Sequence, residues 1–146
     1  MTVPRIGIEL PKENTIVGRI GENLASYYLE AAGIECSIVD RRGSDIWANA
    51  GSKLFTVEVK AAAAPALSGT TKSGKEHHYY NFNLQKKEAD QFLLTCLDTN
   101  LIRVLSREKL LERLPGARVM LHMSPDEFTE EFMYEDISRL KRYYSQ

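Results

Sequence analysis

Residues Ser44–Lys60 have the sequence SDIWANAGSKLFTVEVK, which is typical of a β-hairpin. Gly51 and Ser52 are a two-residue turn signal between two runs in which polar and apolar residues alternate. A turn centred there pairs residues whose numbers sum to 103. Asp45 is therefore predicted to lie directly opposite Glu58.

The two faces of this predicted hairpin differ in polarity, because side chains alternate across a strand. One face is mostly polar and the other is apolar. The polar face holds Asp45, Trp47, Thr56, Glu58 and Lys60, and the apolar face holds Ile46, Ala48, Phe55, Val57 and Val59. We expect the apolar face to pack into the core of the protein.

The pair Asp45 and Glu58 needs a compensating positive charge. Two carboxylates about 5 Å apart repel by roughly 3 kcal/mol at an effective dielectric constant near 20. Hard divalent cations such as Mg²⁺ take carboxylate ligands, keep several waters and share phosphate oxygens with a substrate. The pair therefore predicts a metal site open to a phosphodiester. Lys60 points to the same side and is placed to orient or deprotonate an attacking water.

Asp45, twelve intervening residues and the run Glu58-Val59-Lys60 resemble the catalytic signature of the PD-(D/E)xK nuclease superfamily. Ser44 stands where the family usually has proline. The resemblance extends over residues 16–114 and implies a restriction-endonuclease-like α/β fold, in which a mixed sheet is flanked by helices. It also implies that Asp45, Glu58 and the Val59 carbonyl hold Mg²⁺, which Mn²⁺ can replace, and that Lys60 orients the water.

A helix is predicted before the hairpin, from about Ile16 to Ala32, with Asn14 or Thr15 as its cap. It carries two stripes. The apolar stripe is Ile16, Ile20, Leu24, Tyr27 and Ala31, and the neighbouring stripe of mostly small residues is Gly18, Gly21, Glu22, Ala25, Leu29 and Ala32. A glycine inside a helix costs about 1 kcal/mol relative to alanine. Close approach of this helix to the sheet would explain both glycines.

Glu22 is the one acid in the stripe of small residues, which would bring it toward the sheet. The segment GRIGENLASYYLEAAG resembles the first helix of PD-(D/E)xK nucleases, in which a glutamate often completes or supports the metal site. The resemblance makes Glu22 a candidate catalytic residue. The alternative is that Glu22 joins a local network or pairs with Arg19 at the surface.

The order of the other patterned segments extends the hairpin into a sheet. Strands are expected at Glu35–Asp40, Tyr79–Leu84, 92–97, 101–105 and Val119–Met123, and helices at Ser106–Leu114 and within Pro125–Tyr144. The segment Pro65–Lys75, rich in Ser, Thr, Gly and Lys, is predicted to be a mobile loop. We predict an α/β fold with a central mixed sheet of four or five strands, one helix before the hairpin and at least one after it.

Basic residues gather in the middle of the chain. Residues 41–87 carry 8 Lys and Arg against 3 Asp and Glu, a net charge of +5, whereas the whole chain has −1. This segment contains the hairpin, so DNA is the expected partner of the metal site, and the alternative is an ordinary solvated surface. The residues expected to contact DNA are Arg41, Arg42, Lys72, Lys75, Lys86 and Lys87, with His77 and His78 beside the loop lysines.

The bulk composition predicts one domain, residues 1–146, with residues 1–14 as an irregular N-terminal arm. A chain of 146 residues with 43% hydrophobic and 27% charged residues is long enough to bury its own core. It has no apolar run that would span a bilayer and no basic-then-apolar leader, so we expect a cytoplasmic protein without a membrane partner. Cys36 and Cys96 are expected to be buried, reduced thiols.

These patterns predict a Mg²⁺-dependent DNA endonuclease. Two alternatives stay open, a structure-specific Holliday-junction resolvase and a nucleic-acid-binding module that kept the nuclease fold without activity. Cutting both strands of a duplex needs two catalytic centres, so we also predict a homodimer. Its contact would use apolar surface near the C-terminus, contributed by Phe128, Phe132, Tyr134, Tyr143 and Tyr144.

Overall fold

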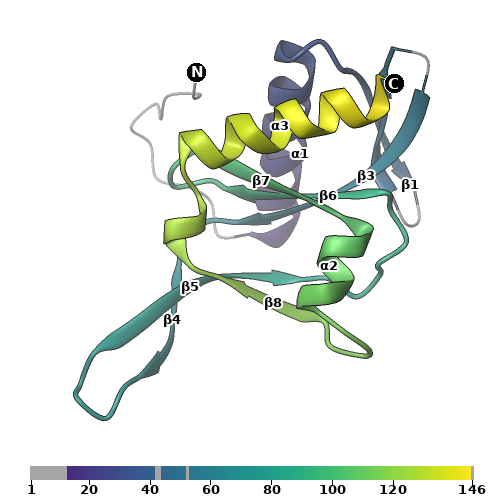
Figure 1. The fold of residues 1–146 in the computed structure, drawn as a ribbon. Coiled ribbons are helices and arrows are strands. Elements are labelled where there is room, and N and C mark those ends of the chain that lie inside the picture. The colour runs from purple at the N-terminus through teal and green to yellow at the C-terminus, as the bar shows by residue number, and fades with distance from the viewer. Residues whose placement is uncertain (1–12, 42–43, 52, 146) are drawn as a thin grey trace.

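The computed structural model describes residues 13–41, 44–51 and 53–145. The N-terminal arm predicted at 1–14 lies almost wholly outside these ranges. The described residues form, in chain order, α1 (Asn14–Ala31), β1 (Glu35–Arg41), β2 (Ser44–Ala50), β3 (Lys53–Ala62), β4 (Ala66–Thr70), β5 (Glu76–Asn83), β6 (Gln91–Cys96), β7 (Leu101–Ser106), α2 (Arg107–Arg113), β8 (Met120–Met123), a 3₁₀ turn η1 (Pro125–Glu127) and α3 (Glu130–Tyr144), as drawn in Figure 1.

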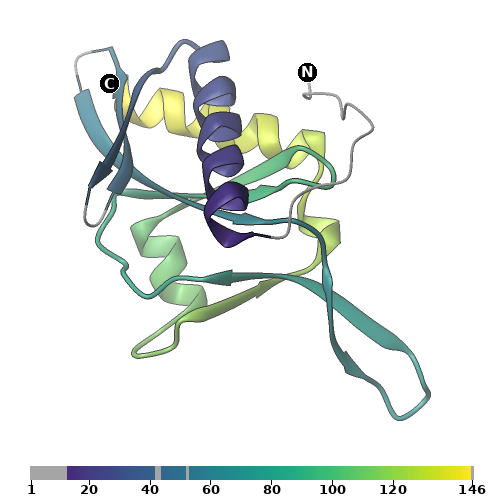
Figure 2. The ribbon, with the colours of Figure 1, turned by 180° about the vertical axis from the view of Figure 1, so that it is seen from behind.

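The central sheet has five strands in the order β1-β2-β3-β6-β7. It is mixed, because β3 and β6 are parallel while the other neighbours are antiparallel. Figures 1 and 2 show α1 and α3 over one face of this sheet, and α2 with a second sheet over the other. The predicted α/β fold, with a mixed sheet of four or five strands and helices before and after the hairpin, is confirmed.

The hairpin of β2 and β3 has the predicted register. Ile46 pairs with Val57 and Ala48 pairs with Phe55, and each pair sums to 103. Gly51 in the turn has a φ of 76°, a conformation that favours glycine. The apolar face is buried as predicted, with exposed fractions of 6% or less at Ile46, Ala48, Phe55, Val57 and Val59. Continuing the same register places Asp45 opposite Glu58.

Helix α1 packs on the central sheet through its small residues. A Cβ at Gly21 would lie 2.7 Å from the Ala61 Cβ and 2.9 Å from the Thr95 Oγ1, which no ordinary side chain tolerates. The predicted close approach is therefore confirmed at Gly21. It is wrong at Gly18, where an added Cβ would meet nothing within 4 Å.

The predicted start of the helix is also wrong. The helix begins two residues earlier, at Asn14, with Glu13 at the N-cap position and no side-chain capping bond, so neither Asn14 nor Thr15 is the cap. The stripe of small residues faces the sheet as predicted, since Gly21 touches it and Ala25 and Leu29 are fully buried. In the neighbouring apolar stripe Leu24 is buried, whereas Ile16 and Tyr27 are exposed.

The second sheet has three strands in the order β4-β5-β8 and was not predicted. Part of it replaces the expected mobile loop at Pro65–Lys75, because β4 and the start of β5 form an antiparallel hairpin there. Figures 1 and 2 show this hairpin projecting from the rest of the protein. The far half of β5 pairs with β8, and the core between the two sheets includes Tyr80, Phe82, Phe92, Leu94, Leu121 and Phe128.

The C-terminal aromatic residues are divided between core and surface. Phe128 and Tyr144 are only 6% and 9% exposed, and the Tyr144 ring stacks on Phe55 with a centroid distance of 3.8 Å. Both residues are therefore part of the core, which corrects their prediction as dimer contacts. Phe132, Tyr134 and Tyr143 are exposed at 41%, 43% and 63%.

The two cysteines are free thiols, as predicted. Cys96 is fully buried, whereas Cys36 is only half-buried. Burial raises the pKa of the Cys36 thiol to about 12. Among the helices in the described ranges, none has the length and apolar character that crossing a bilayer requires.

Candidate active site

The hairpin brings three of the predicted site residues together. Asp45 lies near the start of β2, and its Oδ2 accepts a hydrogen bond of 2.8 Å from the backbone amide of Val59 on β3. Lys60 lies on the same side of β3 as Glu58, and its Nζ is 3.8 Å from Glu58 Oε1. The site therefore combines two carboxylates with an ammonium group that is 38% exposed.

Glu58 is buried without full hydrogen bonding. The residue is 9% exposed, and its Oε2 has no hydrogen-bond partner among the residues that the structure describes. Burial raises the pKa of its carboxyl to about 6; Lys60 opposes the rise, Asp45 adds to it and Lys86 opposes it. A buried carboxylate oxygen without a donor is costly unless a cation meets it. Burial, more than repulsion by Asp45, therefore disfavours the charged form of Glu58.

The oxygen atoms available at the site suit a hard divalent cation. Asp45 and Glu58 offer carboxylates and Val59 offers a backbone carbonyl, which are ligand types that Mg²⁺ accepts while it keeps several waters. Within the described part of the chain, no three His, Cys, Asp or Glu side chains gather into a group that would hold a metal on its own. The backbone oxygen and water would have to complete the coordination shell.

Glu22 is not brought into one group of carboxylates with Asp45 and Glu58. Val57, Val59 and Ala61 pack on the α1 side of β3, so alternation along the strand directs Glu58 and Lys60 to the opposite face. The helix nevertheless passes close by, since Gly21 lies over Thr95, whose hydroxyl donates to the Lys60 carbonyl at 3.2 Å. The part that Glu22 plays in catalysis stays a prediction.

The segment between β5 and β6 adds a lysine to the site. Lys86 lies close enough to Glu58 to lower the pKa of that carboxyl. The segment is fixed by Asp90, whose Oδ2 accepts bonds of 3.0 and 3.2 Å from the amide and hydroxyl of Thr56. Arg107 donates to Asp90 Oδ1 at 3.1 Å. No local sequence pattern indicates Asp90, because its partner Thr56 is 34 residues away.

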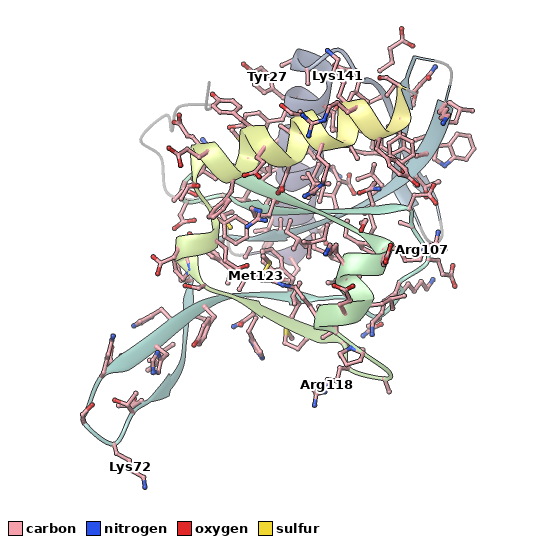
Figure 3. The ribbon with its side chains drawn as sticks, in the orientation of Figure 1. Tyr27, Lys72, Arg107, Arg118, Met123 and Lys141 are labelled. Carbon is pink, nitrogen blue, oxygen red and sulfur yellow. The ribbon has the colours of Figure 1, made fainter. Side chains whose placement is uncertain are left out.

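The other predicted DNA-binding residues have different surroundings. The Lys87 Nζ donates to the backbone carbonyls of Leu114 and Gly116 at 2.7 and 3.1 Å, so this ammonium uses two of its three donors to anchor a loop. Lys72 and Lys75 lie exposed at the end of the projecting hairpin, and Figure 3 labels Lys72 there. Arg42 and the Arg41 side chain fall outside the described residues.

A cavity of about 580 Å³ lies between α2, α3 and the start of β6, and Asp90 and Arg107 are part of its lining. Its lining includes Ser106, Arg107, Leu111, Arg139 and Tyr143, and none of Asp45, Glu58 and Lys60. The chemistry of the carboxylates, not the size of a hollow, therefore locates the candidate site. A long polymer such as DNA is bound on an open surface and does not require an enclosed pocket.

The architecture is a nuclease-like α/β fold. It is similar to the solved structure of a bacterial homing endonuclease, I-Ssp6803I, with a TM-score of 0.64 over 91% of this chain and 94% of that chain. The two sequences are 15% identical, so the similarity is one of fold. No protein-family model and no curated protein sequence matches the chain.

Proposed function

We propose that the chain is a metal-dependent DNA endonuclease of the PD-(D/E)xK type, which hydrolyses phosphodiester bonds. The observation that carries the proposal is the buried Glu58 carboxylate beside Lys60, whose Oε2 has no hydrogen-bond partner among the described residues. A binding module without activity has no use for such a costly group. The nuclease-like fold supports the same conclusion.

Each residue of the hairpin has a separate role in this proposal. Asp45, Glu58 and the Val59 carbonyl would hold Mg²⁺ or Mn²⁺. A bound divalent ion supplies charge stabilisation at the phosphate and makes its water a better nucleophile. Lys60 orients that water, because its ammonium lies 3.8 Å from Glu58 Oε1 and its side chain is partly exposed to solvent. Lys86 attracts the phosphate backbone toward the two carboxylates.

We also infer that the working unit is a homodimer. One chain offers one hairpin site, and a duplex has two strands to cut, for which a two-fold axis is the simplest arrangement. Phe132, Tyr134 and Tyr143 remain as exposed aromatic surface after Phe128 and Tyr144 are assigned to the core. Sedimentation at micromolar concentration should give about twice the 16.6 kDa chain mass.

The test compares cleavage of supercoiled plasmid, linear duplex and a four-way junction with Mg²⁺, with Mn²⁺ and with chelator. Lys60→Ala should abolish cleavage while calorimetry still detects metal binding, whereas Glu58→Gln should lose both. Lys53→Ala is the matched control, because Lys53 is an exposed lysine at the other end of β3. Metal-dependent cleavage of the junction alone would favour the resolvase alternative. The proposal of an enzyme would be excluded if the wild type cleaved none of the substrates. It would also be excluded if Asp45→Ala cleaved them as fast as the wild type does.

A further inference from the structure

The hairpin that projects from the protein is formed by β4, a tip at residues 71–75 and the Glu76–Tyr79 half of β5, and we call it the arm. Its two strands pair with each other from Ala66↔Tyr79 to Thr70↔Glu76. Figures 1, 2 and 3 show it extending away from the two packed sheets. A lone two-stranded ribbon is marginal in water, so an arm of this kind calls for a partner that covers it.

The arm is held in a fixed direction relative to the candidate active site. Strand β5 continues without a break from the arm into the second sheet, where Tyr80 and Phe82 are buried and pair with β8. The other strand, β4, begins six residues after Lys60, directly beyond the end of β3. One strand of the arm is therefore continuous with the second sheet, and the other is joined to β3 by only residues 63–65.

The tip of the arm is ordered by its own hydrogen bonds. The Thr71 amide donates to the Lys75 carbonyl at 2.8 Å, and the Gly74 amide donates to the Thr71 carbonyl at 2.9 Å. The Thr71 hydroxyl also accepts from the Lys75 amide at 3.0 Å. This turn presents Lys72 and Lys75 to solvent in a defined position. A preformed tip loses less conformational entropy when it binds a partner.

The side chains of the arm suit a polyanion better than a protein surface. Protein interfaces are enriched in aromatic residues and depleted in lysine at their centre, whereas this tip carries two lysines among Ser, Thr and Gly. The Glu76 carboxylate lies 3.3 Å from the His78 ring. Whenever that imidazole is protonated, its charge reduces the repulsion between Glu76 and a bound anion. Leu67 is the one large apolar side chain exposed on β4, at 56%.

One face of the arm also carries groups that form hydrogen bonds with base edges. His77 and Tyr79 are alternate residues of β5, and their rings stack with centroids 6.2 Å apart and an interplanar angle of 18°. The row continues toward the second sheet with Asn81, whose Oδ1 is 2.5 Å from His122 Nδ1 on β8. Imidazole, phenol and amide groups all offer donors or acceptors to bases.

We propose that the arm enters the major groove of duplex DNA, with Lys72 and Lys75 on the phosphates and the His77–Tyr79 face against base edges. A major groove about 12 Å wide admits a two-stranded ribbon, and five residues of strand span roughly 17 Å, enough to cross it. Phosphate contacts position a protein and base contacts specify the sequence. Lys72 and Lys75 at the tip therefore contribute affinity, and His77 and Tyr79 contribute sequence selectivity. The inference rests on DNA being the substrate.

The first experiment measures binding of a random-sequence duplex by fluorescence anisotropy over a range of KCl concentrations, without divalent ions. Lys72→Ala/Lys75→Ala should weaken binding about tenfold and reduce the slope of log K against log salt by about 2, since each phosphate contact contributes about 0.9. Lys109→Ala/Lys141→Ala is the control with the same change of charge on the body of the protein, and it should leave both values near wild type.

The second experiment selects bound sequences from a randomised duplex pool. The wild type should enrich a motif whose guanine N7 atoms, which face the major groove, are protected from methylation. His77→Ala should broaden that motif at some positions while overall affinity changes little. Suppose that the wild type binds and cuts DNA, and that the arm variants keep both its motif and its salt slope. This result would overturn the arm proposal and leave the proposed function standing. Loss of dimers in those variants would assign the arm to a second copy of the chain. A wild type that binds no duplex would overturn both proposals.

Discussion

The Asp90 carboxylate accepts hydrogen bonds from both the backbone amide and the hydroxyl of Thr56, at 3.0 and 3.2 Å. The contact is reciprocal, because the Thr56 hydroxyl also accepts from the Asp90 amide at 3.0 Å. Thr56 is two residues before Glu58 on β3, and Asp90 ends the segment that carries Lys86. One side-chain pair thus fixes the position of the additional lysine relative to the catalytic strand.

Thr56→Val should show how much this contact contributes. Valine keeps the branched shape but removes the hydroxyl, which leaves the Asp90 amide and one carboxylate interaction without a partner. We expect a loss of about 1–2 kcal/mol in the free energy of unfolding, measured with urea, and slower cleavage because Lys86 is less well placed. Thr56→Ser retains the hydroxyl and should recover most of both. A valine variant as stable as wild type would show that the contact is dispensable.

The buried carboxyl of Glu58 predicts a dependence of stability on pH in metal-free protein. Its pKa rises from 4.5 to about 6 in the fold, so the folded state disfavours the charged form. The loss of folding stability from this carboxyl is absent below about pH 4 and develops between about pH 4.5 and 6. Above pH 6 it is constant, on the order of 2 kcal/mol. In the Glu58→Gln variant the side chain at position 58 does not ionise, so this loss is absent.

As pH rises from about 4 to 7, the free energy of unfolding of Glu58→Gln should therefore increase relative to that of the wild type, by on the order of 2 kcal/mol. Urea unfolding in chelator at several pH values measures this difference. Glu135→Gln, which makes the same change at an exposed position on α3, is the control. A difference independent of pH would mean that the carboxyl is well solvated.

The hairpin could be predicted from the sequence because its information is local. Gly51 marks the turn, alternation assigns the faces, and the two together determine that Asp45 lies opposite Glu58. The close approach of α1 to the sheet could also be predicted at Gly21, from the stripe of small residues. The open surroundings of Gly18 could not, because they depend on a sheet formed later in the chain.

The arm and the Asp90 contact depended on information that is not local. The β4 sequence ALSGT has no clear alternation, since neither of its faces is fully buried, and the tip is ordered by hydrogen bonds that composition does not reveal. A Gly, Ser and Lys-rich segment therefore resembled a mobile loop. Asp90 lies in a polar segment whose role is apparent only when β6 is placed beside β3.

A buried ion-pair network attaches α3 to the edge of the sheet. Asp136 is 2% exposed; its Oδ2 accepts bonds of 2.7 Å from Arg103 Nε and 2.9 Å from the Val104 amide, and Arg139 lies 3.3 Å from its Oδ1. Asp136→Ala should cost about 3–5 kcal/mol, because it leaves the largely buried Arg103 guanidinium without its carboxylate and the buried Val104 amide without its acceptor. Glu135→Ala is the matched control and should change stability by less than about 0.5 kcal/mol. Comparable urea midpoints for the two variants would contradict this assignment.

The two glycines of α1 provide a direct test of how the helix approaches the catalytic strand. Gly21→Ala places a Cβ 2.7 Å from the Ala61 Cβ and 2.9 Å from the Thr95 hydroxyl, so the helix must move outward, at a cost of about 1–3 kcal/mol. Gly18→Ala adds the same methyl group where nothing lies within 4 Å, and helix propensity should then stabilise the protein by up to about 1 kcal/mol.

Opposite changes in thermal midpoint for these two variants are the expected result. Thr95 donates to the Lys60 carbonyl, so displacement of the helix at Gly21 should also disturb the catalytic strand. Cleavage by Gly21→Ala should therefore fall even at temperatures where the variant is fully folded, while Gly18→Ala cleaves at the wild-type rate. If Gly21→Ala were as stable and active as wild type, α1 would not be held against β3 at this point.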